Sequence, residues 1–205
     1  MKYKWLNKIG NKKLIIFFNG WGMDDNIVAH LDYEKFDVLM FYDYNTLETD
    51  FDFETLNLYT EKNLIAWSMG VMVGSKGKWN SICFTQTVAI NGTLKPIDEK
   101  FGIHPKIFDL TIKGFNEKGR ARFIDSMLDE KQKIVCERDI ENQLSELIAL
   151  KNYNSDESFK YNKVLISNND KIIPTKSQVA FWEIQPNLNG GHCPFFQFKK
   201  WSEIL

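Results

Sequence analysis

The stretch Leu64-Ile65-Ala66-Trp67-Ser68-Met69-Gly70 sets a serine between a short apolar run and a glycine. It matches the G-x-S-x-G pattern of a nucleophile elbow, in which the serine occupies the sharp turn from a strand to a helix. Ala66 replaces the first glycine, and alanine is the least intrusive replacement in a turn too tight for larger side chains. We therefore expect a short helix from Met69 to about Lys76, beneath a raised Ser68 hydroxyl. The alternative is a strand that ends in an ordinary serine helix cap, because a five-residue match with one substitution also arises by chance.

Four further apolar runs predict the other strands of a sheet. They lie at residues 14–18, 38–42, 82–90 and 164–167, and the third is interrupted by polar residues 85–87. Continuous apolarity that ends in a glycine or a polar loop is typical of parallel strands buried on both faces. The sequence therefore predicts a mostly parallel sheet.

The region from about residue 96 to residue 153 differs, because its apolar residues recur at helical spacing and no strong strand signal occurs there. Alternating strands and helices around a helical insert indicate an α/β domain that carries a helical cap. We expect the core at residues 1–95 and 156–205 and the cap at residues 96–155. The last helix is expected at residues 194–201, because proline is favoured in the first turn of a helix.

Composition sets limits on the class of protein. The 205 residues, 43% of them hydrophobic, suffice for one domain with a substantial core. A formal net charge of -1 argues against nucleic-acid binding by the protein as a whole, and the three distant cysteines suggest neither a metal site nor a disulfide framework. The sequence has no signal-peptide run and nothing near the roughly 20 apolar residues of a membrane span. We expect a cytoplasmic monomer that uses no metal or organic cofactor and binds neither nucleic acid nor a membrane.

A serine nucleophile needs a base, and the chain has three histidines. His192 lies in a glycine-rich loop near the C-terminus, where a hydrolase fold carries its base, whereas His30 and His104 are expected to be ordinary packing or surface residues. Asp170 follows the last expected strand, and its carboxylate would hold the histidine in the useful tautomer, although loops also favour aspartate for turns. The order Ser68, Asp170, His192 is that of nucleophile, acid and base in α/β-hydrolases. The sequence thus predicts a compact α/β-hydrolase with a mostly parallel central sheet and a small helical cap.

An oxyanion hole is the remaining requirement for acyl transfer. The segment Asn19-Gly20-Trp21-Gly22 follows the first clear strand, and its glycines permit close approach of the backbone to a substrate. We expect the backbone N–H groups of Trp21 and Met69 to be the donors, each contributing roughly 2.7–4 kcal/mol to barrier stabilisation. The Trp21 side chain is also expected to cover the acyl pocket. The alternatives are a tight turn at the glycine and a tryptophan that only packs.

With these residues assembled, the chain resembles the BioG-type carboxylesterases of biotin synthesis through most of its length. The resemblance rests on FFNGWGMD at 17–24, AWSMG at 66–70, AINGT at 89–93, FGIHP at 101–105 and GHCPF at 191–195. It implies demethylation of a pimeloyl methyl ester carried on acyl carrier protein, a step that ends chain elongation and frees a carboxylate. It also implies Ser68 as nucleophile, His192 as base and Asp170 as acid.

The resemblance further implies an acidic carrier protein as partner. A basic and partly aromatic stretch in the expected cap would meet that surface, and its charge would mainly raise the association rate. The candidate contact residues are Phe115, Lys118, Arg120 and Arg122. The alternative for each charged residue is a solvated helix face.

Three rival functions remain to be distinguished. Another acyl thioesterase or a short-chain esterase would use the same three residues, so substrate profiling alone separates these enzymes. A non-catalytic carrier-protein-binding module on this fold would fail to react with a serine-directed probe. A nucleotide-binding domain fits poorly, because Gly20-Trp21-Gly22 is not a G-x-G-x-x-G fingerprint.

Overall fold

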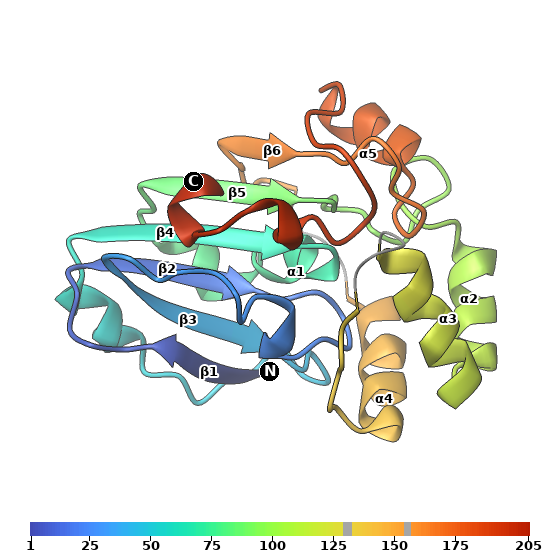
Figure 1. Ribbon diagram of the computed structural model, residues 1–205, viewed down its shortest axis with the longest axis horizontal. Coiled ribbons are helices and arrows are strands. Elements are labelled where there is room, and N and C mark those ends of the chain that lie inside the picture. Colours follow the sequence, from blue (N-terminus) through green and yellow to red (C-terminus); the bar gives the residue numbers. More distant parts are fainter. Residues whose placement is uncertain (129–132, 154–156) are drawn as a thin grey trace.

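The computed structural model describes residues 1–128, 133–153 and 157–205, and within them six strands form a single sheet. The strands lie in the order β1-β3-β2-β4-β5-β6, side by side in Figure 1. β1 pairs antiparallel with β3, and the remaining neighbours pair in parallel, which confirms the mostly parallel sheet. The strand bounds are β1 Lys2–Asn7, β2 Lys13–Phe18, β3 Phe36–Tyr42, β4 Glu61–Trp67, β5 Gln86–Ile90 and β6 Lys163–Leu165.

β2 shows why these runs form a central sheet. Its residues 14–18 are fully buried, and the strand lies between β3 and β4. Alternate side chains point to opposite faces. Ile16 and Phe18 belong to one apolar cluster, whereas Ile15 and Phe17 belong to a second cluster on the other face. Both faces are therefore covered, and the middle of the sheet cannot slip in register without exposing apolar side chains.

The edge strand β1 was not among the predicted strands. Its residues alternate between exposed lysines and half-buried aromatic side chains, so only one face packs on the core. Tyr3 packs against Phe41, and Trp5 stacks on Tyr59. Lys2 and Lys4 remain exposed, as charged residues on an edge strand usually do.

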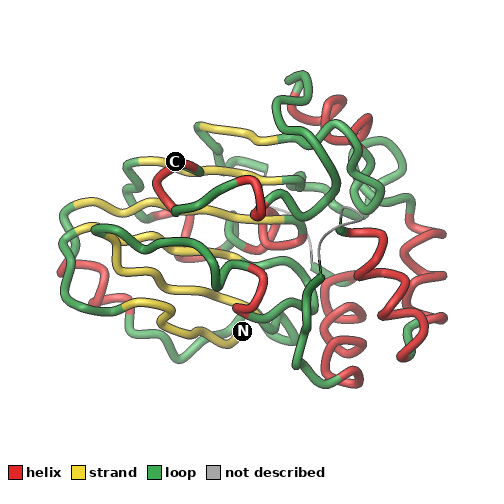
Figure 2. The backbone as a smooth tube through the Cα atoms, in the orientation of Figure 1, coloured by secondary structure: helices red, strands yellow, loops and turns green. Residues whose placement is uncertain are grey.

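Five α-helices occur in the described residues, and three of them form a group beyond the carboxyl ends of the parallel strands (Figures 1 and 2). The bounds are α1 Met69–Val73, α2 Pro105–Gly114, α3 Glu117–Met127, α4 Ile140–Lys151 and α5 Thr175–Trp182. The group of three is α2, α3 and α4, so the helical character expected between residues 96 and 153 is confirmed. The proposed division into core and cap stays a prediction, and its boundary at residues 155 and 156 lies outside the described residues.

The helix predicted at residues 194–201 is wrong. That segment forms a 3-10 turn at Phe195–Gln197 and another at Trp201–Glu203, joined by extended chain. The backbone of residues 199–201 bonds instead to Asp32, whose N–H donates to the Lys199 carbonyl oxygen and whose carbonyl oxygen accepts from the Trp201 N–H. A helix would have used these same backbone groups internally, so the two arrangements exclude each other.

Smaller differences concern the ends of elements. α1 ends at Val73 instead of near Lys76. β5 begins at Gln86, so residues 82–84 precede the strand. β6 ends at Leu165, before the expected end at Ser167. No helix in the described ranges is both long enough and apolar enough to cross a bilayer.

Candidate active site

Ser68 occupies a strained turn between β4 and α1. Its backbone has φ 58° and ψ -126°, a left-handed conformation that a residue with a side chain rarely adopts. The turn is fixed because the Ser68 N–H donates to the Ile90 carbonyl oxygen at 2.9 Å. A Cβ atom at Gly70 would lie 2.4 Å from the Phe18 carbonyl oxygen, so only glycine lets α1 pack this closely against β2. The strand–turn–helix geometry expected of a nucleophile elbow is therefore present, and such strain is typical of functional sites.

Three residues far apart in sequence form a hydrogen-bonded row at this turn. The His192 Nε2 atom lies 2.8 Å from the Ser68 Oγ atom, and the His192 Nδ1 atom lies 2.8 Å from an Asp170 carboxylate oxygen. All three residues are buried, and the exposed fraction is 1% for His192 and 6% for Ser68. A proton on Nδ1 that is donated to Asp170 leaves Nε2 free to accept from the serine hydroxyl. The arrangement can therefore transfer a proton from the serine to the imidazole.

The Asp170 carboxylate is held by more than the histidine. One oxygen accepts from the backbone N–H groups of Ile172 and Ile173, at 2.8 and 3.1 Å. The other oxygen accepts from the Gln178 side chain at 2.8 Å, in addition to its contact with His192. Gln178 was missed by sequence reasoning, and nothing in its helix marks it out. Together these donors keep the carboxylate aimed at the imidazole.

The histidine loop is anchored through its backbone. The His192 carbonyl oxygen accepts from the Trp67 indole N–H and from the Asn91 side chain, both at 2.9 Å. The Asn91 side-chain oxygen accepts from the Ser167 N–H at 2.8 Å, so one buried amide ties the end of β5 to both late loops. Asn91 was not selected as a site residue. A polar residue directly after a buried strand was the signal that could have found it.

The loop Asn19-Gly20-Trp21-Gly22 leaves one N–H group unused. The Asn19 side chain accepts from the Gly20 N–H at 2.8 Å, while a carboxylate on α4 accepts from the Gly22 N–H at 3.1 Å. In the part of the chain that the structure describes, no acceptor faces the N–H of Trp21 or of Met69. Trp21, Met69 and Ser68 line the same cavity. Two unpaired donors beside a serine can stabilise a developing oxyanion.

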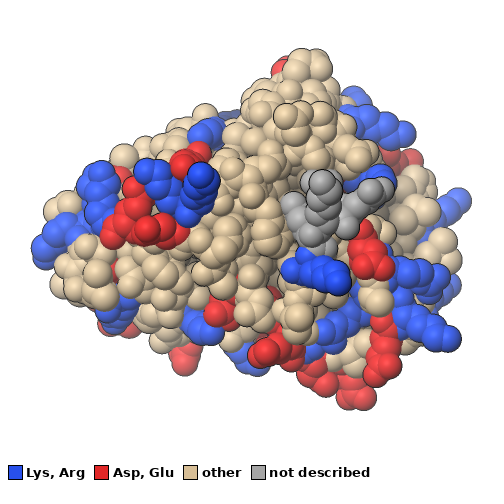
Figure 3. Space-filling model, in the orientation of Figure 1, with Lys and Arg blue, Asp and Glu red and all other residues tan. Residues whose placement is uncertain are grey.

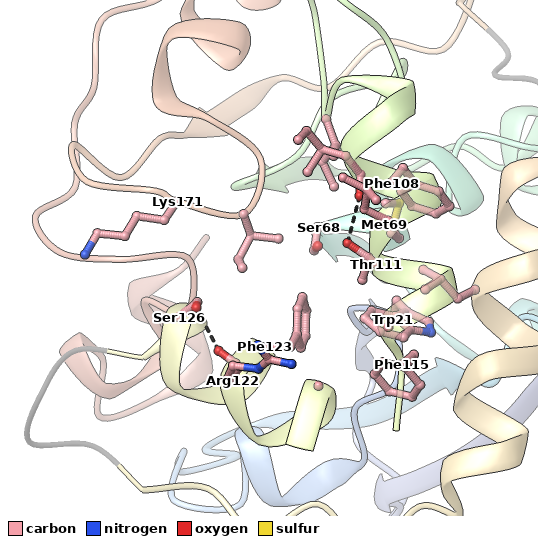
Figure 4. Close-up of a pocket in the computed structure, with 17 residues that line it drawn as sticks. Trp21, Ser68, Met69, Phe108, Thr111, Phe115, Arg122, Phe123, Ser126 and Lys171 are labelled. Atoms are coloured by element: carbon pink, nitrogen blue, oxygen red, sulfur yellow. Dashed lines mark hydrogen bonds between the residues drawn. The ribbon is translucent and has the colours of Figure 1, made fainter. Parts of the chain in front are cut away.

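The cavity beside Ser68 has a volume of about 450 Å³ and a largely apolar wall. The Trp21 ring packs against Phe115 and Phe123, with ring centroids 5.0 and 4.8 Å apart. Figure 4 shows Trp21 and Phe115 on the side of the cavity opposite Lys171. Arg122 and Lys171 contribute the cationic side chains of the lining. The cavity is therefore lined by the serine, by an apolar wall and by two positively charged side chains.

Comparison with known proteins gives the family. The sequence matches the family model described as "Pimeloyl-ACP methyl esterase BioG" over residues 1–204. The chain belongs to the BioG family. A crystal structure of BioG from Haemophilus influenzae is 31% identical and has a TM-score of 0.90, with 100% of this chain and 99% of that chain covered.

Two other comparisons extend the picture of this BioG-family chain. An esterase from Thermogutta terrifontis has a TM-score of 0.66 at 13% identity, with coverage of 94% and 86% of the two chains. At that identity it shows the fold alone, which is that of the α/β-hydrolases, and family and fold together make the chain a hydrolase. A Bacteroides fragilis protein named malonyl-[acyl-carrier protein] O-methyltransferase is 35% identical over 182 residues. The match covers 84% of this chain but only 37% of that longer protein.

The basic residues predicted to contact a partner differ in their surroundings. Arg122 on α3 is exposed and lines the cavity, whereas Lys118 is exposed but does not line it. The Arg120 guanidinium is half-buried and donates to the backbone carbonyl oxygens of Cys136 and Arg138. Arg120 therefore fastens the segment before α4 to α3 in this BioG-family chain.

The other two histidines lie away from the row of Ser68, His192 and Asp170. The His30 ring stacks on Phe196, and its Nε2 atom lies 3.1 Å from the Phe195 carbonyl oxygen. His104 caps α2 and accepts from the Lys106 N–H through its Nδ1 atom. Both histidines therefore have structural contacts of their own.

Proposed function

We propose that this chain is a serine carboxylesterase that hydrolyses the methyl ester of a pimeloyl group carried on acyl carrier protein, as a step of biotin synthesis. The observation that carries the proposal is the row of Ser68, His192 and Asp170 with its two 2.8 Å contacts. The family description names this activity, and the apolar cavity beside the serine suits an acyl chain.

The reaction proceeds in two acyl-transfer steps. The Ser68 oxygen attacks the ester carbonyl carbon while His192 Nε2 takes the hydroxyl proton, and Asp170 stabilises the resulting imidazolium. The N–H groups of Trp21 and Met69 donate to the oxyanion. The C–O bond to the methoxy group breaks, His192 returns its proton to that oxygen, and methanol leaves. Water then gives up a proton to His192 and attacks the acyl carbon. As the bond to the Ser68 oxygen breaks, His192 returns that proton to this oxygen, and the acid product leaves and ionises to a free carboxylate.

The substrate carries a second acyl bond that the enzyme has to spare, the thioester to the carrier arm. An acyl chain bound along the Trp21 and Phe115 wall brings only its distal ester to Ser68. The carrier arm then leaves the cavity past Arg122 and Lys171, whose charges favour its phosphate. Figure 3 shows further lysine and arginine side chains over the region of α2, α3 and α4, interspersed with acidic ones. We assign the encounter with an acidic carrier protein to this face.

The Bacteroides fragilis relative supports a methyl ester as the substrate. Its name assigns to it the methylation of a malonyl group on acyl carrier protein, and this chain resembles about a third of it. A methyl ester made on a carrier-bound acyl group needs a later hydrolysis to free the carboxylate. An esterase beside a methyltransferase would remove the group that the methyltransferase adds.

The test is the release of free carboxylate from pimeloyl-carrier-protein methyl ester, followed by intact-protein mass spectrometry. Wild type and Ser68→Ala are compared side by side, with circular dichroism as the control for folding. Demethylation by wild type alone, with the thioester intact, is the expected result. Cleavage of the thioester instead would favour a thioesterase. A folded wild type that neither demethylates nor reacts with a fluorophosphonate would favour a non-catalytic module.

The docking part of the proposal has its own test. Arg122→Glu and Lys118→Glu are expected to slow carrier-linked substrate severalfold more than a small nitrophenyl ester, and the effect should shrink at high salt. Arg120 is left unchanged in this test because its guanidinium holds backbone carbonyl groups. Equal effects on both substrates would remove the docking surface from the proposal.

A further inference from the structure

A fully buried carboxylate on α4 contacts the oxyanion loop, and the proposed reaction gives it no chemical step. Glu146 is 0% exposed. One of its oxygens accepts from the Gly22 N–H at 3.1 Å, and the other accepts from the Tyr44 N–H at 2.8 Å. Burying a carboxylate is unfavourable unless it is paired and hydrogen-bonded. Its position therefore calls for a reason beyond packing.

The groups around Glu146 fit the ionised form. The Arg138 guanidinium, itself 8% exposed, donates to the Gly22-facing oxygen of Glu146 at 2.7 Å. Burial raises the pKa of Glu146, while Arg138 and the two backbone N–H groups oppose that rise. All three partners are donors, so a protonated carboxyl would face them with a proton that has no acceptor among them. We take the charged carboxylate as the state that holds the loop.

Residues on or next to α4 also bind the carbonyl oxygen of Gly22. The Gln143 side chain donates to the Gly22 carbonyl oxygen at 2.7 Å, and the Cys136 thiol donates to that oxygen at 3.0 Å. The backbone carbonyl oxygen of Gln143 in turn accepts from the Trp21 indole N–H at 2.8 Å. Both polar groups of the Gly22 backbone are therefore fixed by residues on or next to α4.

Three successive backbone N–H groups in this loop differ in whether they have a hydrogen-bond acceptor. The Asn19 side chain engages Gly20, Glu146 engages Gly22, and the N–H of Trp21 between them has no acceptor among the described residues. Holding the neighbours on each side fixes the peptide plane that carries the middle N–H, because the backbone has only two soft dihedral angles per residue.

We propose that Glu146 is a positioning residue, whose carboxylate holds the Trp21–Gly22 backbone so that the Trp21 N–H points at the oxyanion. The inference rests on the proposed function, since it needs Ser68 to form an oxyanion at all. Under this proposal α4, a helix of the proposed cap, contributes to the chemical step as well as to any substrate binding. Glu146 acts here through Gly22 and does not touch the substrate.

The primary test is Glu146→Gln, which keeps the shape but replaces one accepting oxygen with an amide that faces donors. The assay uses a soluble short-chain nitrophenyl ester, with active sites counted by fluorophosphonate titration. We expect kcat per active site to fall at least about tenfold, short of the roughly 10²–10³-fold loss for a deleted donor. The KM is expected to stay within about twofold, because the donor acts on the transition state.

A second readout separates positioning from stability. An alkyl boronic acid forms a tetrahedral adduct with an active serine and engages the oxyanion donors. Its binding should weaken in Glu146→Gln by a factor similar to the fall in kcat, which a loss of folded protein would not produce once active sites are counted. Lys151→Gln is the matched control, because Lys151 lies on the same helix in an exposed ion pair with Asp109. This control is expected to retain wild-type kcat and boronate affinity.

If Glu146→Gln does not fold, the double variant Arg138→Met/Glu146→Gln removes the guanidinium that has lost its Glu146 partner, while Lys2 still pairs with Asp43, the second carboxylate beside Arg138. That variant should regain a folded state but keep the lowered kcat. Wild-type kcat and boronate affinity in either folded variant would overturn the inference and leave the esterase proposal standing. A wild type that is inert to the ester, the boronate and the fluorophosphonate would overturn both.

Discussion

Replacing Gly70 with alanine tests whether the fit of α1 against β2 sets both stability and catalysis. An added Cβ atom would lie 2.4 Å from the Phe18 carbonyl oxygen and 2.6 Å from the Asn19 carbonyl oxygen. The shorter distance is about 1 Å less than the 3.4 Å at which ordinary van der Waals contact begins. Both oxygens are backbone atoms and cannot rotate away, so α1 and the end of β2 have to separate by about that amount.

The size of the effect follows from this displacement. Overpacking of a tight site typically destabilises by about 1–3 kcal/mol, and alanine in a helix recovers roughly 0.5–1 kcal/mol relative to glycine. We expect a net loss of about 1 kcal/mol, which for a chain of this size lowers the Tm by roughly 2–4 °C. The same shift moves the Met69 N–H relative to Trp21, and a misplacement of about 1 Å can lower kcat about 10²-fold.

The measurement combines thermal unfolding with nitrophenyl-ester turnover per titrated active site. Gly114→Ala is the stability control, because no atom lies within 4 Å of a Cβ built at that helical glycine. It should leave the Tm unchanged or slightly raised. Gly70→Ala with wild-type Tm and kcat would refute the reasoning, since the backbone would then have absorbed the added methyl group without displacement.

Three further predictions follow from other contacts. Asp170→Asn should lower kcat by about 10⁴-fold with little change in folding, since an amide cannot hold the same His192 tautomer, and near-normal turnover would assign the acid to another carboxylate. Trp67→Phe removes the donor to the His192 carbonyl oxygen and should lower the free energy of unfolding by about 1 kcal/mol, so an unchanged urea midpoint would contradict it. Burial opposes ionisation of Asp43, but the hydrogen bond from Lys2 and nearby positive charge prevail and lower its pKa. Its contribution to stability is therefore present above the unfolded pKa of about 3.9 and is lost as pH falls toward the folded value, so the Tm difference between wild type and Asp43→Asn should narrow below about pH 4 instead of staying constant.

The central strands were predictable because they are buried on both faces. The run at residues 14–18 is apolar at every position, and burial on two sides leaves no place for a polar residue. β1 was missed because it has no continuous apolar run. It is an edge strand with one packed face, so polar and apolar residues alternate over only six positions. The period-two pattern of Lys2, Tyr3, Lys4 and Trp5 was nevertheless present in the sequence.

The C-terminal segment shows where local pattern is overridden by tertiary contacts. Pro194 and the aromatic residues after it favour a helix locally. In the fold, Phe195 packs on Phe17 and Trp67, and Trp201 packs on the same Phe17 ring. Spanning this face while bonding to a distant loop requires extended chain between two short turns. Pairing with residues more than 160 positions away has no local sequence signal.

The candidate triad could be selected from sequence because Ser68 and Asp170 follow strands, because His192 lies in a glycine-rich loop, and because chain order is restrictive. The residues that hold it could not. Glu146 and Gln178 are polar side chains in helices, and from sequence a solvated helix face is the simplest expectation for both. Only the packed structure shows that they are buried against the oxyanion loop and the acid loop.

The distance along the chain between Ser68 and His192 has a consequence during protein synthesis. The two residues are 124 positions apart, so at about 5–20 residues per second the ribosome adds the base roughly 6–25 s after the serine. Until then a nascent chain can pair β1 to β5 and form the strained turn, but its hydroxyl has no imidazole to take its proton. Onset of the proposed esterase activity would therefore report the docking of the segment that carries His192.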